Sequence, residues 1–169
     1  MRDPNIEFPK VKSWRCRSYA RRRPFGTQGA RHWTVADRSE TVVFQWLAAG
    51  DRGDLDAFDD LLHPGAVIHA PAGLSTHSAE AEKKVWREAL SAMPDLRHDV
   101  QEVVVDGDVE MARVIVTGTI RAAFGGVAGS GGGFRIDQAV ITQLRDGKVV
   151  EAWEIADMAA VRQQVDETD

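Results

Sequence analysis

The sequence has few of the residues that form covalent or metal cross-links. Its only cysteine is Cys16, which excludes an internal disulfide and a cysteine-based zinc site. Its His, Asp and Glu residues show no spacing typical of metal ligands, so we expect no metal and no other cofactor. No apolar run approaches the roughly 18 residues of a membrane span, and no apolar core of a secretory signal is present. We therefore expect a cytoplasmic protein with no membrane partner.

Charge is divided unevenly along the 169 residues. Residues 1–36 contain nine Lys and Arg against two acidic residues, a net charge of +7. Residues 37–169 contain twelve basic and twenty-four acidic residues, a net charge of −12. An acidic body repels nucleic acid, so we expect no nucleic-acid partner. The alternative is a patch at 21–23 that binds phosphate groups of nucleic acid or of an anionic membrane.

Composition also predicts the domain boundaries. Three prolines and Gly26 disfavour regular structure in the basic segment. We expect a disordered extension at 1–36, one α+β domain at 37–165 and a short tail at 166–169. A domain of this length has room for a core that holds a small-molecule pocket.

The hydrophobic period changes from helical to alternating near Pro94. The helical part predicts helices at 39–47, 54–62 and 79–93, with a short strand at 66–70. The alternating part predicts four strands joined by Asp-Gly turns and followed by a helix; these elements are expected at 96–105, 109–124, 134–144, 148–155 and 158–165. Helices followed by an antiparallel meander indicate an α+β fold.

Glycine is concentrated between two of the predicted strands, at residues 125–133. The run lacks the Gly-Lys-Ser/Thr ending of a phosphate-binding loop and does not precede a helix. We expect it to be a mobile connector at the mouth of a pocket.

Several segments carry a resemblance to a known family. They are Ala49-Gly50-Asp51, His63-Pro64, residues 116–119 and residues 134–157, in which the run LRDGKVVEAW at 144–153 is the most specific. Through these residues, the chain from about 38 to 165 resembles the SnoaL-like polyketide cyclases of the NTF2-like superfamily. The resemblance implies an NTF2-like cone, with N-terminal helices packed against a curved, mainly antiparallel sheet. Such folds host many chemistries, so the reaction depends on the site.

The resemblance also implies a reaction and its residues. Members of the cyclase branch close an aromatic polyketide ring by intramolecular aldol condensation, with an acidic residue and no metal. The acid corresponds to Glu154, where the characterised cyclases have Asp, and a supporting Gln corresponds to Gln138. A histidine of the pattern is replaced by Val140, and a polar residue on the short early strand corresponds to Ile68 or His69.

The residues around Glu154 are consistent with acid–base chemistry. Strand alternation places Glu154 on one face with Ala152 and Ala156, whose small side chains leave room for a ligand. Burial in an apolar pocket raises the pKa of a carboxyl group, and removal of a proton next to a ketone needs a base that titrates near the working pH. The alternative is a salt-bridged structural Glu near the end of a strand.

Two further polar residues are candidates for the same site. Gln138 is the polar exception on an apolar strand face and could stabilise an enolate by a hydrogen bond; alternatively, its amide satisfies backbone groups at the mouth of the barrel. His69 could be a second acid/base or an oxyanion donor, or a hydrogen-bonded histidine at the rim. We expect a structural role for His63 and a surface position for His98.

Arg113 gives the strongest objection to catalysis. An arginine on a core strand needs an anionic partner, and Glu154 is available if the two strands are adjacent. Such an ion pair would lower the pKa of Glu154. Arg113 and Val140, together with Trp46, Trp86 and Ile68, complete the predicted wall of the substrate pocket.

Two classes of function remain open. The first is a cofactor-free enzyme that acts on a hydrophobic ketone-bearing or polycyclic small molecule, by cyclase-like aldol chemistry or a related isomerisation. The second is a non-catalytic domain that binds a small molecule or dimerises. A third possibility is another reaction on the same scaffold, such as assistance to hydroxylation or a dehydration. The resemblance further implies a homodimer that associates through the sheet.

Overall fold

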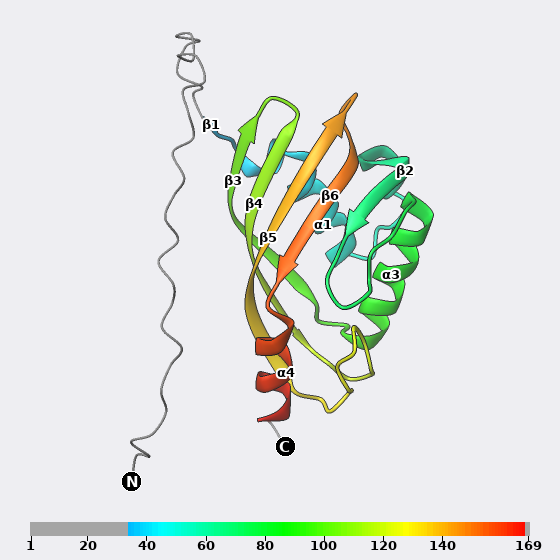
Figure 1. Ribbon diagram of the computed structural model, residues 1–169, viewed down its shortest axis with the longest axis vertical. Coiled ribbons are helices and arrows are strands. Elements are labelled where there is room, and N and C mark those ends of the chain that lie inside the picture. The colour runs from blue at the N-terminus through cyan, green and yellow to red at the C-terminus, as the bar shows by residue number, and fades with distance from the viewer. Residues whose placement is uncertain (1–33, 168–169) are drawn as a thin grey trace, which may run out of the picture. The chain divides into compact units, whose positions relative to one another are not determined.

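The structure is a computed structural model that describes residues 34–167, and in this part of the chain helices pack on one face of a curved sheet (Figure 1). Cys16, the arginines at 21–23 and most of the predicted extension lie outside the described residues. The elements in chain order are β1 Thr34–Val35, η1 Arg38–Glu40, α1 Val42–Asp51, α2 Phe58–Leu61, β2 Leu62–His69, α3 Ala79–Ala92, β3 Arg97–Asp106, β4 Val109–Thr119, β5 Gly133–Arg145, β6 Lys148–Ala156 and α4 Met158–Asp166.

Within residues 34–167 the sheet has six strands in the order β1-β3-β4-β5-β6-β2. All neighbours are antiparallel except β2 and β6, which are parallel. The predicted α+β class, with a mainly antiparallel sheet, is confirmed. The predicted turn between β5 and β6 is also present, with φ of 51° at Asp146 and 75° at Gly147, as a tight hairpin requires.

Irregular pairing helps to curve the sheet. The register between β3 and β4 shifts between Val100 and Glu102, so Gln101 is an extra residue that bends the strand. The first residues of β5 extend beyond β6, because the pairing of these two strands begins only at Gln138 and Ala156. This end of the sheet lies next to α4 and the connector between β4 and β5 (Figure 1). A hollow on the concave face results.

Polar side chains fix where the helices begin. The side chain of Ser78 accepts a hydrogen bond from the backbone N–H of Ala81 at the start of α3, and Asp157 caps α4 in the same way. The first turn of α1 is capped from the sheet: the Glu110 carboxylate of β4 accepts the N–H groups of Val42 and Val43 at 3.1 and 2.7 Å. This contact fixes α1 against the concave face.

Two predicted elements end differently in the structure. The helix expected at 54–62 is reduced to α2: it begins only at Phe58, and it ends at Leu61 because Leu62 already pairs with Val149 of β6. The strand expected at 109–124 ends at Thr119, whose N–H and hydroxyl donate to Asp95 at 3.0 and 2.7 Å. Tertiary hydrogen bonds therefore end both elements earlier than the hydrophobic pattern predicts.

The core lies between the concave face of the sheet and the helices. Phe58 contacts the rings of Trp46 and Trp86 edge-on, at centroid distances of 6.5 and 5.9 Å. A Cβ atom on Gly50 would lie 2.3 Å from the Trp86 ring. Glycine at this position therefore allows α1 to approach the ring closely, which places the end of α1 beside the hollow.

Candidate active site

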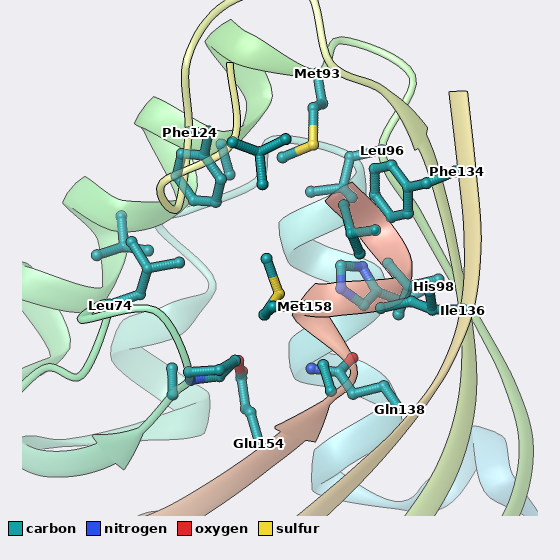
Figure 2. Close-up of a pocket in the computed structure, with 18 of the residues that line it drawn as sticks. Leu74, Met93, Leu96, His98, Phe124, Phe134, Ile136, Gln138, Glu154 and Met158 are labelled. Atoms are coloured by element: carbon teal, nitrogen blue, oxygen red, sulfur yellow. The ribbon is translucent and has the colours of Figure 1, made fainter. Parts of the chain in front are cut away.

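A cavity of about 130 Å³ opens between the concave face of the sheet, α3, α4 and the β4–β5 connector (Figure 2). This is roughly ten times the space that one water molecule needs. Most of the lining side chains are apolar, among them Leu74, Met93, Leu96, Phe124, Phe134, Ile136 and Met158. Four lining side chains carry a carboxyl, amide or imidazole group: Glu82, His98, Gln138 and Glu154.

Glu154 points from β6 into this cavity. It faces the same way as Ala152 and Ala156, while Trp153 and Ile155 are exposed on the other face, so the predicted alternation is confirmed. Within residues 34–167 the Glu154 carboxyl has no hydrogen bond or ion pair. Burial, and secondarily the negative charge of Glu82, raise the pKa of Glu154 from 4.5 to about 8. A carboxyl of this kind changes its protonation state near neutral pH.

Glu82 is a second carboxyl in the cavity wall, and the sequence analysis missed it. It lies on α3, is 3% exposed, and accepts hydrogen bonds from Thr76 Oγ1 at 2.8 Å and Trp86 Nε1 at 2.9 Å. Burial raises the pKa of Glu82, and the two hydrogen bonds partly oppose this effect. These donors favour a Glu82 anion, which repels a second negative charge at Glu154. Glu82 lies on the same face of the helix as Trp86 and Met93. This helical spacing was the signal in the sequence that Glu82 faces the core.

Gln138 is a diagonal neighbour of Glu154 on the concave face. Gln138 pairs with Ala156 and Glu154 pairs with Val140, so the two polar side chains come from adjacent strands two residues apart. Gln138 is 8% exposed, and its buried Oε1 has no hydrogen-bond partner in the described part of the chain. Figure 2 shows Gln138 and Glu154 at the same end of the pocket. A buried amide oxygen that accepts no hydrogen bond is costly unless a ligand donates one to it.

His98 also lines the cavity, so its expected surface position is wrong. Its ring nitrogen Nδ1 is 2.7 Å from Asp51 Oδ1, and its backbone N–H donates to Asp51 Oδ2 at 2.7 Å. The His98 ring packs against Trp86, with a centroid distance of 5.2 Å. His98 faces inward with Leu96 and Val100, so strand alternation over 96–100 was an available signal for this face; the bulge at Gln101 changes the inward set only after Val100.

His69 does not reach the cavity, and its predicted place in the site is wrong. Its Nε2 is 2.8 Å from Glu151 Oε1, and its ring stacks on Trp153 at 5.4 Å. The His69 and Glu151 side chains are each 43% exposed. Parallel pairing of β2 with β6 brings His69 opposite Trp153 rather than beside Glu154.

Arg113 is likewise absent from the cavity wall, which corrects its predicted place in the pocket. It lies on the convex face of β4, half exposed, with Asp137 at 3.2 Å and Glu102 at 3.7 Å. The inward residues of β4 are Ala112, Val114 and Val116. Arg113 and Glu154 therefore face opposite sides of the sheet and form no ion pair.

The remaining predicted wall residues divide into core and pocket. Trp86 lines the cavity, as expected. Trp46, Ile68 and Val140 are fully buried in the core and do not line it. These three predictions fail because the side chains pack beneath the hollow, where apolar residues are as favourable as in a pocket wall. The connector contributes Val127 and the adjacent Phe124 to the wall.

The described residues contain neither a membrane-spanning helix nor a group of metal-binding side chains. No helix in residues 34–167 is long and apolar enough to cross a membrane. In the same residues no three His, Cys, Asp or Glu side chains come together as a group that could hold a metal ion.

Comparison with known proteins finds similarity to one family. A family model of SnoaL-like polyketide cyclases matches residues 40–165. IdmH of Streptomyces antibioticus, a proposed polyketide cyclase, is 30% identical, with a TM-score of 0.65 over 78% of this chain and 99% of its own. TsrD of Streptomyces laurentii is 25% identical, with a TM-score of 0.67 over 76% and 94% of the two chains.

A third solved structure is similar to the same extent. AclR of Streptomyces galilaeus, a proposed hydroxylase, is 25% identical, with a TM-score of 0.64 over 79% of this chain and 98% of its own. No curated protein sequence matches the chain. The structural neighbours confirm the predicted NTF2-like cone.

Proposed function

The chain belongs to the SnoaL-like polyketide cyclase family, and from this we propose that it is a cofactor-free enzyme for a hydrophobic, ketone-bearing polycyclic molecule. The observation that carries the proposal is the Glu154 carboxyl in an apolar cavity, beside a Gln138 amide whose buried Oε1 has no hydrogen-bond partner in residues 34–167. The reaction would be aldol ring closure of the polyketide cyclase type or a related isomerisation.

Glu154 would move the proton on carbon. Its carboxylate takes a proton from the carbon next to a ketone, and the negative charge moves to the ketone oxygen as an enolate. Because the pKa of Glu154 is about 8, a useful fraction is ionised near neutral pH and the group is a stronger base than an exposed carboxylate. The neighbouring Gln138 amide can donate a hydrogen bond to the enolate oxygen. The apolar wall excludes water and favours a fused-ring substrate.

The position of Arg113 supports this assignment. An ion pair between Arg113 and Glu154 would lower the pKa of the acid and weaken it as a base. Arg113 instead pairs with Glu102 and Asp137 on the convex face. Glu154 thus keeps the raised pKa on which the proposed chemistry depends.

The proposal can be tested with a simple bicyclic ketone. Wild-type protein in D₂O should exchange the α-protons of 1-tetralone faster than buffer, as followed by proton NMR. The exchange rate should rise with pH through about 8, because the Glu154 carboxylate is the base. Glu154→Gln should lower the exchange rate by about 10²-fold or more. Glu151→Gln removes an acid from the convex face of the same strand and should leave exchange unchanged.

The same experiment decides between enzyme and binding domain. If 1-tetralone binds, as measured by line broadening, but wild type and Glu154→Gln exchange it at the buffer rate, the catalytic proposal fails. The non-catalytic small-molecule-binding function then takes its place.

We also propose that the protein is a homodimer that associates through the convex face of the sheet. Met111, Ile141 and Trp153 occupy one row across β4, β5 and β6. Met111 is 39%, Trp153 37% and Ile155 60% exposed, so this face carries large apolar side chains in solvent. A second copy would cover them.

A cytoplasmic location stays a prediction.

A further inference from the structure

The pocket contains a histidine that the proposed function does not use. His98 lies at the start of β3, and Asp51 is the last residue of α1. Their side chains are 9% and 11% exposed, so the pair is shielded from bulk solvent. Both carboxylate oxygens of Asp51 accept hydrogen bonds from His98, one from the backbone and one from the ring. This double contact fixes the position and the orientation of the imidazole.

The contact with Asp51 also fixes the tautomer of the ring. A carboxylate only accepts hydrogen bonds, so His98 Nδ1 must carry a hydrogen. In the neutral ring the lone pair is then on Nε2, which makes no hydrogen bond within residues 34–167. A ring held in this way presents Nε2 as the nitrogen that can take up or release a proton. The His98 ring is part of the cavity wall, so the imidazole lies beside the space that a substrate would occupy.

The sheet register places Gln138 between His98 and Glu154. His98 lies opposite Val116, which lies opposite Ile136, two residues before Gln138. Glu154 lies opposite Val140, two residues after Gln138. In Figure 2, His98 and Glu154 lie on different sides of the Gln138 amide. The pocket therefore offers an acid/base group at each side of a hydrogen-bonding amide.

We propose that His98, positioned by Asp51, is the second acid/base group of this pocket and moves the proton on oxygen, while Glu154 moves the proton on carbon. The inference rests on the proposed function and extends it to a two-site reaction. In the ring-closing direction Glu154 takes the proton from carbon, and the resulting enolate carbon bonds to a second carbonyl carbon. The oxygen of that carbonyl receives a proton from His98 Nε2.

Protons and charges balance over this cycle. Glu154 ends protonated and His98 ends neutral, and the proton returns from Glu154 to His98 through water before the next turnover. In the reverse direction neutral His98 accepts the hydroxyl proton, the carbon–carbon bond breaks, and Glu154 protonates the carbon. The substrate class is therefore a β-hydroxyketone or its open diketone. Asp51 touches no reacting atom and is a positioning residue.

Two probes separate the two proton transfers. Exchange of 1-tetralone α-protons requires only the carbon site. Retro-aldol cleavage of 4-hydroxy-4-(6-methoxy-2-naphthyl)butan-2-one, which releases a fluorescent aldehyde, requires both sites. His98→Gln should lower the cleavage rate by about 10²-fold or more while exchange stays within about threefold of wild type. Glu154→Gln should lower both rates.

Controls distinguish a chemical role from a structural one. Added imidazole should restore cleavage in His98→Ala, which a purely structural histidine would not show. His69→Gln removes a histidine–glutamate pair on the convex face and should change neither rate. Asp51→Asn should lower the cleavage rate and change the ¹⁵N shifts of the His98 ring. In wild type at pH 8, these shifts should show a hydrogen on Nδ1 and none on Nε2.

Each result bears on a specific claim. Equal loss of exchange and cleavage in His98→Gln, without rescue by imidazole, would overturn the role of His98 while the role of Glu154 stands. A hydrogen on Nε2 in wild type at pH 8 overturns it as well, and this measurement needs no variant to fold. If wild type exchanges no 1-tetralone protons, the proposed function fails, and the inference fails with it.

Discussion

At the scale of the residue, Glu154 links protonation to folding. Burial raises its pKa from 4.5 to about 8, so the folded state holds the proton over a pH range in which the unfolded chain has lost it. The stabilising contribution is fully present below pH 4.5 and is lost progressively as the pH rises toward about 8. The isosteric amide of glutamine has no proton to lose in this range.

This linkage gives a prediction on stability. Urea unfolding of Glu154→Gln and wild type should give similar midpoints near pH 5, and the variant should become the more stable protein as the pH rises toward 8.5. The gap should open mainly between the two pKa values, because only there do the folded and unfolded states of wild type bind different numbers of protons. A gap that does not change with pH would contradict the burial of an ionisable Glu154.

At the scale of the element, the start of α1 depends on a residue of the sheet. Thr41 makes no side-chain capping bond, and the Glu110 carboxylate accepts the N–H groups of Val42 and Val43 instead. A carboxylate at a helix N-terminus also interacts favourably with the helix dipole. The same helix ends at Asp51, which positions His98. The Glu110 cap holds the start of α1 on the sheet, and the end of the same helix holds His98 in the cavity wall.

We predict that Glu110→Gln lowers the free energy of unfolding by about 1–3 kcal/mol, because one acceptor and the charge are lost in a buried site. Chemical denaturation measures this difference. Glu102→Gln, on the exposed side of β3, is the matched control and should change stability by less than about 0.5 kcal/mol. Equal effects of the two substitutions would mean that the cap contributes nothing.

At the scale of the whole molecule, the two faces of the sheet have separate roles. The concave face holds the cavity, and the convex face exposes Met111, Trp153 and Ile155. Ile155→Asp should convert the proposed dimer to a monomer, because a buried unpaired charge at an interface is costly. Light scattering on the full chain should then give 18.6 kDa instead of twice that mass. Lys84→Ala on α3 should leave the mass of the wild type unchanged.

The size measurement also tests the proposed interface directly. A wild-type protein that is already monomeric at micromolar concentration contradicts the dimer. A dimer that persists in Ile155→Asp places the interface elsewhere than on the convex face.

The fold class and two of the four polar residues in the cavity wall could be predicted from the residues alone. The spacing of hydrophobic residues and the residues of a turn are local features of the sequence. The change from helical to alternating spacing, together with the Asp146-Gly147 turn, therefore predicted α3, β5, β6 and their order. Strand alternation is equally local and placed Glu154 and Gln138 on one face of β6 and β5. The resemblance to a family supplied the suggestion that this face carries acid–base chemistry.

The side of each strand that faces the cavity, and the distant residues that meet there, follow from strand pairing and packing. Arg113 and His69 lie on strands that adjoin the site, but pairing turns both to the convex face. His98 lies near the end of a strand, and its inward position becomes evident through Asp51, which contacts it from 47 positions away. Glu82 enters from a helix whose angle to the sheet follows from packing. Such contacts depend on register and on the closing of long loops, which no local pattern contains.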